Sequence, residues 1–287
     1  MPPVDDLKVE AFQMFGRLAA KAGLAAETYV CGAEWIKHDQ NQRQIVQRYD
    51  GRDSAAVVLK YVARPADTDE FTAMLGAHQA ACDALDAIPA YTVPQILAAD
   101  SEAQAYLMRF AKGDTFLDLC RQTDDHAPLL RRAGGWLAAF HGATVQGTRP
   151  FQPHFMVNHL QRLVARVESG QRRINGKQRF AAYVDRIADY APQAQGHAGS
   201  IAAKHGDLNG LNLVMSVDET AAFDFSATTP SPVGYDIARL LQSYTQMAGD
   251  LDALPKGYAV PPAAWEAFFQ GYTLVPPDDP TVQFLTR

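Results

Sequence analysis

Cysteine is scarce in this sequence of 287 residues, and the three cysteines that it has are far apart. Cys31, Cys82 and Cys120 show no CxxC spacing, so we expect buried free thiols rather than disulfides or a metal site. No run of about 20 apolar residues, the length of a membrane-spanning helix, is present either. The start, MPPVDDLKVEAFQMF, has two early aspartates and no apolar stretch of signal-peptide length. These absences favour a cytoplasmic protein that does not span a membrane.

Positive charge is also in short supply. The sequence has 26 Lys and Arg against 32 Asp and Glu, a formal net charge of -6. This balance removes the electrostatic driving force of a general nucleic-acid binder. What the sequence does have is apolar residues, which make up 47% of it, enough for a packed core in one large domain or two modest ones.

The N-terminal part has the pattern of a small mixed lobe. Residues 5–22 have apolar positions every three or four residues behind an acidic start, which predicts an amphipathic helix ended by Gly23. QRQIVQRY and SAAVVLKYVA, separated by DGRD, predict an antiparallel hairpin. Residues 67–85 indicate a second helix, and YTVPQILAAD and AQAYLMRF two further short strands. We therefore predict an N-lobe over 1–111, with a hinge at about 106–113.

The remainder, residues 112–287, is mostly helical in pattern. One interruption, NLVMSVDETAAFDF, has two apolar segments flanking DET and predicts a hairpin that Asn212 opens and Asp224 closes. The fold class expected is α+β, with a small antiparallel-sheet N-lobe and a mostly helical C-lobe.

A polar cluster, KHGDLNGLNL at 204–213, precedes this hairpin. Because a hairpin brings its two ends together, we expect Asp224 to lie beside Asn212, with Asp207 five residues upstream. Mg²⁺ favours one or two carboxylates, an amide oxygen, waters and phosphate oxygens. Asn212 and Asp224 are therefore candidate metal ligands, which leaves Asp207 for another task.

Lys60 is a lone charge inside the apolar strand VVLKYV. A buried lysine is costly unless it meets an anion. Phosphoryl transfer needs a cation on the nucleotide, a metal ion that bridges phosphates, and a carboxylate that accepts the proton of the acceptor hydroxyl. These residues together indicate phosphoryl transfer.

The motifs also resemble a known family. HGDLNGLNL, followed by AAFDFS and YDIARLL, is similar to the signature of the aminoglycoside phosphotransferase and choline kinase family, whose members are relatives of protein kinases. VVLK resembles the nucleotide lysine strand, AYLMRFAKGD the hinge, and LAAFHGATV a family helix that ends in Phe-His. Order and spacing agree from about residue 30 to residue 245.

The resemblance implies a two-lobed protein-kinase-like fold that uses ATP and Mg²⁺. Its expected activity is transfer of the γ-phosphate to a hydroxyl of a small molecule, namely a sugar, an amino sugar or an amino alcohol. It also implies roles for single residues. These are Asp207 as catalytic base, Asn212 and Asp224 as metal ligands in the catalytic set, Lys60, Met108 and Phe110 as nucleotide contacts, His205 as a brace of the catalytic loop, and Asp236 as a structural acid at the helix after the metal loop.

Two departures from the family pattern leave an alternative open. The expected phosphate loop at 37–43, within WIKHDQNQRQIV, has no glycine. The residue of the following helix that pairs with Lys60 is Glu70, His78 or Gln79. A catalytically degenerate nucleotide-binding regulatory protein is therefore the second interpretation.

Overall fold

A computed structural model describes residues 4–226, 229–252, 254–255 and 257–287. The chain divides into two compact units, here called unit 1 (Met1–Thr115 and Asn212–Thr228) and unit 2 (Phe116–Leu211 and Thr229–Arg287). The first boundary therefore lies four residues after the predicted one. The sequence also gave no sign that 212–228 groups with the N-terminal part.

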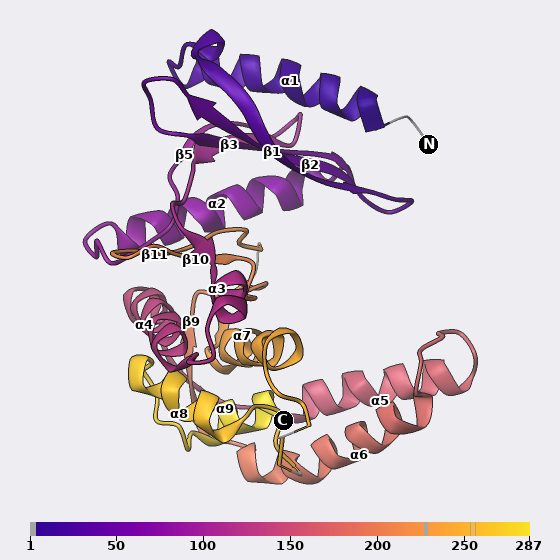
Figure 1. Ribbon diagram of the computed structural model, residues 1–287. Helices are drawn as coiled ribbons and strands as arrows, with labels where there is room; N and C mark the ends of the chain where they lie inside the picture. Colours follow the sequence, from indigo (N-terminus) through magenta and orange to yellow (C-terminus); the bar gives the residue numbers. More distant parts are fainter. Residues whose placement is uncertain (1–3, 227–228, 253, 256) are drawn as a thin grey trace. The chain divides into compact units, whose positions relative to one another are not determined.

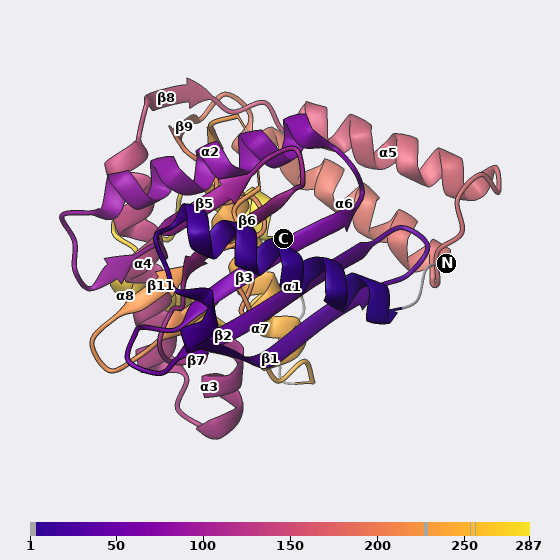
Figure 2. The same ribbon diagram turned by 90° about the horizontal axis from the view of Figure 1, so that it is seen from above.

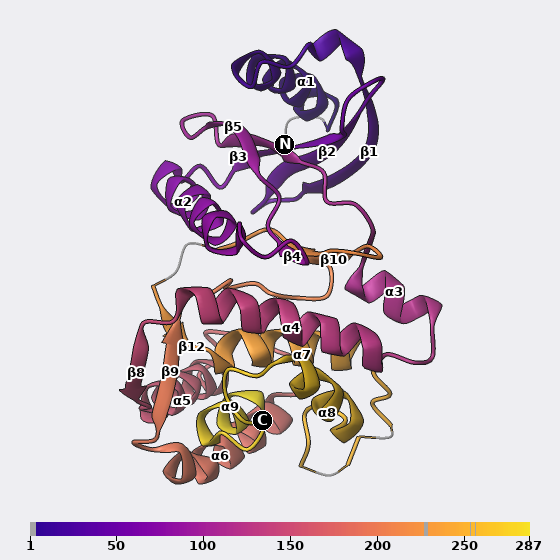
Figure 3. The ribbon, with the colours of Figure 1, turned by 90° about the vertical axis from the view of Figure 1, so that its left-hand side faces the viewer.

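Unit 1 is built on a five-stranded antiparallel sheet with a helix on each face (Figures 1 and 3). Seen from above, α1 lies across the strands (Figure 2). The predicted helices and strands are present, and a further strand, β1, lies at the edge. The sheet order is β1-β2-β3-β6-β5, and the elements are α1 (Val4–Lys21), η1 (Ala26–Thr28), β1 (Tyr29–His38), β2 (Arg43–Gly51), β3 (Val57–Arg64), α2 (Thr68–Leu85), β5 (Ile96–Asp100) and β6 (Ala105–Arg109).

Alternation along β3 and β6 sends successive side chains to opposite faces of this sheet. Leu59 and Leu107 are fully buried in the cluster that α1 covers. Val58 and Tyr106 lie in a second cluster that contains Phe71 of α2. Lys60 is two residues after Val58 in the same strand, so it belongs to the α2 face.

A second small sheet explains why residues 212–228 group with unit 1. The predicted hairpin forms from β10 (Leu213–Met215) and β11 (Thr220–Ala222). Strand β4 (Tyr91–Thr92) pairs parallel to β11, and β7 (Asp114–Thr115) pairs antiparallel to β10. The hairpin is thus hydrogen-bonded on both sides to strands of the N-terminal part of the chain.

Unit 2 is mostly helical, as the sequence predicts, with a small sheet of order β12-β9-β8 that the sequence analysis missed. Helices α5 and α6 form an extended hairpin (Figure 1). The elements are α3 (Phe116–Gln122), α4 (Ala127–Thr144), β8 (Gly147–Pro150), α5 (His154–Glu168), α6 (Lys177–Ala194), β9 (Ala198–Ala202), β12 (Ser231–Pro232), α7 (Gly234–Met247), α8 (Pro262–Gly271) and α9 (Pro280–Thr286).

All three cysteines are free thiols, as expected, but only Cys120 is buried. Cys31 is exposed because it lies on β1, the edge strand of the sheet, and its burial was wrongly predicted. Within the part of the chain that the structure describes, no helix has both the length and the hydropathy to cross a membrane.

Helices α4 and α8 pack so closely that glycine is required at their contact. A Cβ added at Gly134 would lie 2.3 Å from the carbonyl oxygen of Phe268. We expect Gly134→Ala to lower the free energy of unfolding by about 3 kcal/mol, since overpacking against backbone cannot relax cheaply. Gly142 is the matched control in the same helix, because nothing lies within 4 Å of its added Cβ. Gly142→Ala should raise stability by up to about 1 kcal/mol in urea denaturation. Equal changes in unfolding free energy for the two substitutions would contradict the close contact of α4 and α8 at Gly134.

Candidate active site

Lys60 lies in the middle of β3, where its Cα pairs with Val46 of β2 and Tyr106 of β6. Its side chain is only 15% exposed. The ammonium Nζ donates a hydrogen bond to Oδ1 of Asp224, 164 residues further along the chain. The buried lysine thus meets the anion that its apolar surroundings require.

Asp224 follows β11, at the open end of the hairpin. Its φ of 68° lies in the left-handed region, which aspartate adopts more readily than most residues and which is concentrated at functional sites. The Phe223 amide donates to the Asn212 carbonyl oxygen at 3.1 Å, which closes this end of the hairpin. Asn212 is buried, with 8% exposure. The hairpin therefore brings Asn212 and the segment that carries Asp224 to the same end.

None of the α2 side chains proposed for Lys60 supplies its carboxylate partner. Glu70 and Gln79 are exposed, and Gln79 donates to Asp83 at 2.8 Å. His78 is fully buried, with Nε2 2.6 Å from the Pro94 carbonyl oxygen. Burial lowers the pKa of His78, so its ring is neutral at physiological pH. The carboxylate that meets Lys60 comes from the hairpin and not from α2.

The two hinge residues are placed in different surroundings. Met108 is buried in the apolar cluster of Val58 and Tyr106, because its strand β6 lies inside the sheet. Phe110 donates its amide to the Ala56 carbonyl oxygen at 3.0 Å, and its ring lies under the Arg48 guanidinium at 4.2 Å. The structure thus places Met108 in the core of unit 1 and Phe110 beside a cation.

Within the segment 37–43, residues 39–42 form the turn between β1 and β2. Asp39 accepts hydrogen bonds from the amides of Asn41 and Gln42 at 2.7 and 2.8 Å. These amides hold the pKa of Asp39 below its ordinary value. In glycine-rich loops, backbone amides bind phosphate. In this turn, the amides of Asn41 and Gln42 are bound to the carboxylate of Asp39 instead.

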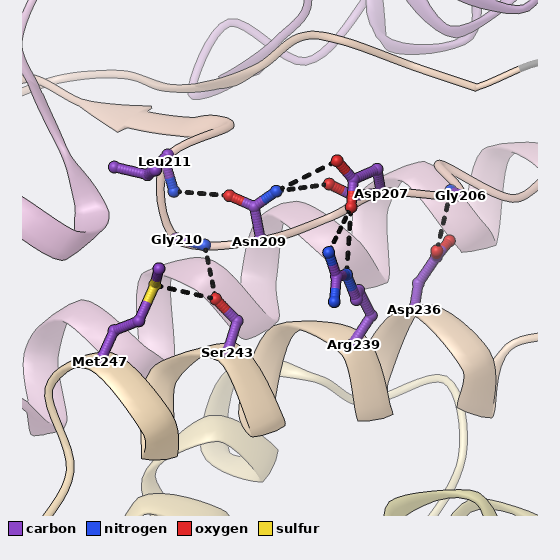
Figure 4. Close-up of polar contacts among 9 residues, drawn as sticks. All are labelled: Gly206, Asp207, Asn209, Gly210, Leu211, Asp236, Arg239, Ser243 and Met247. Carbon is purple, nitrogen blue, oxygen red and sulfur yellow. Dashed lines mark hydrogen bonds and ion pairs between the residues drawn. The ribbon is translucent and has the colours of Figure 1, made fainter. Parts of the chain in front are cut away.

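In unit 2, the loop around Asp207 is fixed by the first turn of α7 (Figure 4). Asp236 accepts the amide of His205 at 2.7 Å and the amide of Gly206 at 3.1 Å. Gly206 has a φ of 89°, a conformation that glycine adopts without strain. His205 is fully buried, and its ring lies edge-on to Trp136, with 6.2 Å between ring centroids.

Asp236 is also the end of a buried chain of hydrogen bonds. His141 Nε2 lies 3.3 Å from Asp236, and Nδ1 of the same ring lies 2.9 Å from the Tyr272 hydroxyl. Burial raises the pKa of Tyr272, so the phenol keeps its proton and donates to His141. Burial alone would raise the pKa of Asp236 as well, but the hydrogen bonds from His141 and the His205 amide hold it below its ordinary value.

Replacing Asp236 with asparagine should therefore destabilise the protein in a pH-dependent way. Because the folded pKa is depressed, the stabilisation is complete at neutral pH and is lost as the pH falls from about 4 through the folded pKa. We expect Asp236→Asn to cost about 3 kcal/mol at pH 7 and less as the pH falls below about 4. Urea denaturation at a series of pH values measures this, with the exposed Asp118→Asn as control. A loss of unfolding free energy that stays the same from pH 7 to below pH 4 would contradict the lowered pKa assigned to Asp236.

Asp207 itself is held by a residue that the sequence analysis missed. Arg239 of α7 donates from Nε and Nη2 to Asp207 Oδ1 at 3.1 and 2.7 Å. Asn209 Nδ2 lies 3.1 Å from the Asp207 carbonyl oxygen and 3.3 Å from its Oδ2. The sequence signal that could have identified Arg239 is its position: it follows Asp236 by three residues, so the two lie one turn apart on the same face of a helix.

The donor set of unit 1 fits a divalent cation. Among the described residues, no group of three or more His, Cys, Asp or Glu side chains could hold a metal ion. Asp224 and Asn212 supply one carboxylate and one amide, which is the small protein contribution that Mg²⁺ accepts when waters and phosphate oxygens complete its shell.

Residues 35–277 match the model of the phosphotransferase enzyme family. Because the match covers most of the chain, the protein is a phosphotransferase and belongs to this family. The resemblance inferred from the motifs is confirmed. No curated protein matches the sequence significantly.

Solved structures support the same fold. A macrolide 2'-phosphotransferase from Brachybacterium faecium has a TM-score of 0.61 and 16% identity over 96% of this chain and 87% of that chain. A glucosamine kinase in complex with glucosamine, ADP and inorganic phosphate has a TM-score of 0.57 and 17% identity, over 93% and 74%. A choline/ethanolamine kinase family protein from Mesorhizobium loti has a TM-score of 0.57 and 14% identity, over 93% and 76%. The protein-kinase-like fold predicted from the sequence is confirmed.

Proposed function

We propose that the protein transfers the γ-phosphate of ATP to a hydroxyl group of a sugar, an amino sugar or an amino alcohol. The observation that carries this proposal is the ion pair between Lys60 and Asp224, which joins the nucleotide-lysine strand to the metal-loop aspartate. Asp207, five residues before Asn212, is bound by Arg239 of α7, and Asp236 of the same helix binds the backbone of its loop. The members of a phosphoryl-transfer set are thus each fixed by specific contacts.

In this proposal Lys60 binds phosphate oxygens, and Asn212 and Asp224 hold Mg²⁺. When bound, the metal ion would neutralise charge on the phosphates. Asp207 accepts the proton of the acceptor hydroxyl, whose oxygen forms a bond to the γ-phosphorus. The bond from that phosphorus to the β–γ bridging oxygen breaks, and ADP leaves with the electron pair.

The acceptor class is supported by proteins of similar fold, which include a glucosamine kinase in complex with glucosamine, ADP and inorganic phosphate and a macrolide 2'-phosphotransferase. Unit 2 also contains a cavity of about 650 Å³, but the described residues that line it belong to α6, α8, α9, the segment before α8 and the C-terminal Arg287, and none of them is Asp207, Asn209 or Arg239. The cavity therefore carries no part of this proposal.

A nucleotide-binding regulator is the second candidate, and the turn at Asp39 favours it. The amides of Asn41 and Gln42 are bound by a carboxylate, which would repel phosphate. Isothermal titration with ATP and Mg²⁺, followed by an ADP-release screen over sugars, amino sugars and amino alcohols, separates the two. Binding with turnover supports the kinase, and binding without turnover of any acceptor supports the regulator.

A further inference from the structure

The contact between Arg239 and Asp207 directs two donors to one oxygen (Figure 4). Each carboxylate oxygen has about two lone-pair positions for hydrogen bonds. The Nε and Nη2 groups of Arg239 both approach Oδ1 of Asp207. They therefore fill the acceptor capacity of that oxygen. A hydroxyl that approaches the carboxylate as a donor must use Oδ2, beside the contact that Asn209 Nδ2 makes there at 3.3 Å.

The backbone of the loop is fixed by other residues of α7. Asp236 accepts the amides of His205 and Gly206 before Asp207. Ser243 accepts the amide of Gly210 after it, with a distance of 3.4 Å. Of these three α7 residues, Arg239 is the one that binds the Asp207 side chain rather than the loop backbone. Its removal should loosen the orientation of the carboxylate, which Asn209 still contacts at Oδ2, while the loop stays in place.

The exposure of the pair argues against a large structural role. The side chains of Arg239 and Asp207 are 55% and 47% exposed. Ion pairs with this degree of exposure contribute little to stability, because water and salt screen them. A pair that adds little to folding yet orients one carboxylate through two charge-assisted hydrogen bonds is suited to positioning.

We propose that Arg239 is a positioning residue that holds Asp207 through Oδ1, so that Oδ2 receives the proton of the acceptor hydroxyl. This inference rests on the proposed function, in which Asp207 is the base. During transfer the hydroxyl proton passes to Oδ2, and the hydroxyl oxygen bonds to the γ-phosphorus as ADP leaves. The protonated carboxyl then gives its proton to solvent. Arg239 keeps its charge throughout and acts only on the orientation of Asp207.

The test compares Arg239→Met and Arg239→Lys with the wild type on ATP, Mg²⁺ and the acceptor of highest rate in the screen. We expect Arg239→Met to lower kcat by about 10- to 100-fold, the scale of a small misplacement of a reacting group. The KM values for ATP and acceptor should stay within about twofold of wild type, because Arg239 is not proposed to bind either substrate. Arg239→Lys should recover part of kcat, and guanidinium ions in the buffer should raise the rate of Arg239→Met alone.

The control is Arg121→Met, which removes another exposed ion pair of unit 2, that with Asp118. It should leave kcat unchanged. Melting temperatures of all these variants should agree within about 3 °C. An unchanged kcat in Arg239→Met, or a raised KM with kcat intact, would overturn the proposal, the second because it would make Arg239 a substrate-binding residue.

A wild-type protein that phosphorylates no acceptor would refute the proposed function and not the positioning of Asp207. Crystal structures of the wild type and Arg239→Met then decide the positioning separately. A carboxylate of Asp207 that changes rotamer in the variant, with the loop backbone unmoved, supports it. The same rotamer in both structures overturns it.

Discussion

Replacing Asp207 with asparagine is expected to lower kcat about a thousandfold, within the range that a general base contributes. The amide keeps the shape of the side chain but cannot accept the proton of the acceptor hydroxyl. Affinity for ATP should change less than about twofold, because in this proposal the nucleotide is bound by Lys60, whose ammonium is bonded to Asp224, while Asp207 acts on the acceptor. Steady-state kinetics with the best acceptor and isothermal titration with ATP and Mg²⁺ measure the two effects.

Asp118→Asn is the control for this experiment, since Asp118 is also an exposed, arginine-paired carboxylate of unit 2. It should leave both kcat and nucleotide affinity unchanged. A kcat of Asp207→Asn within about threefold of wild type would remove Asp207 from the mechanism, because loss of a general base lowers rates by much more.

Replacing Asp224 with asparagine should abolish the effect of Mg²⁺ on ATP binding and lower kcat about a thousandfold, the upper range for loss of one electrostatic stabiliser. Asparagine tolerates the left-handed backbone at this position, so the substitution tests the charge rather than the fold. The measurements are ATP titrations with and without MgCl₂, and turnover at saturating substrates.

Lys60→Met, measured alone and in combination with Asp224→Asn, completes a double-mutant cycle for this ion pair. Because the two side chains form one ion pair, we expect their effects on ATP binding to be non-additive. Asp218→Asn, at the exposed turn of the same hairpin, is the matched control and should behave as wild type. Magnesium-dependent binding that survives in Asp224→Asn would show that the cation is held elsewhere.

The sequence predicted those parts of the site that depend on local pattern. The hairpin signal around DET placed Asn212 and Asp224 at the same end, and the structure closes that end through the Phe223 amide. The isolated charge in VVLKYV marked Lys60 as a residue that needs an anion. Its partner remained open because the contact joins residues 164 positions apart. Only the register of strands that are distant in sequence decides which carboxylate reaches it.

Other features were missed for different physical reasons. Strands β8, β9 and β12 are short and stabilised mainly by their pairing with one another, which single-sequence patterns do not reveal. Cys31 was assigned to the core because its strand, β1, was not predicted. The Asp39 turn did carry a local signal, since an aspartate two and three residues before the amides that it binds is typical of an Asx turn. Arg239 required the knowledge that α7 packs beneath the Asp207 loop (Figure 4).

The most direct test of the account is to incubate the wild-type protein with γ-labelled ATP, Mg²⁺ and a panel of sugars, amino sugars and amino alcohols, and to follow the label. The account predicts that label moves from ATP to a hydroxyl of at least one acceptor, with ADP released in equal amount, and that Asp207→Asn removes this transfer. Tight ATP binding with no label on any acceptor, or equal transfer by the wild type and Asp207→Asn, would contradict it.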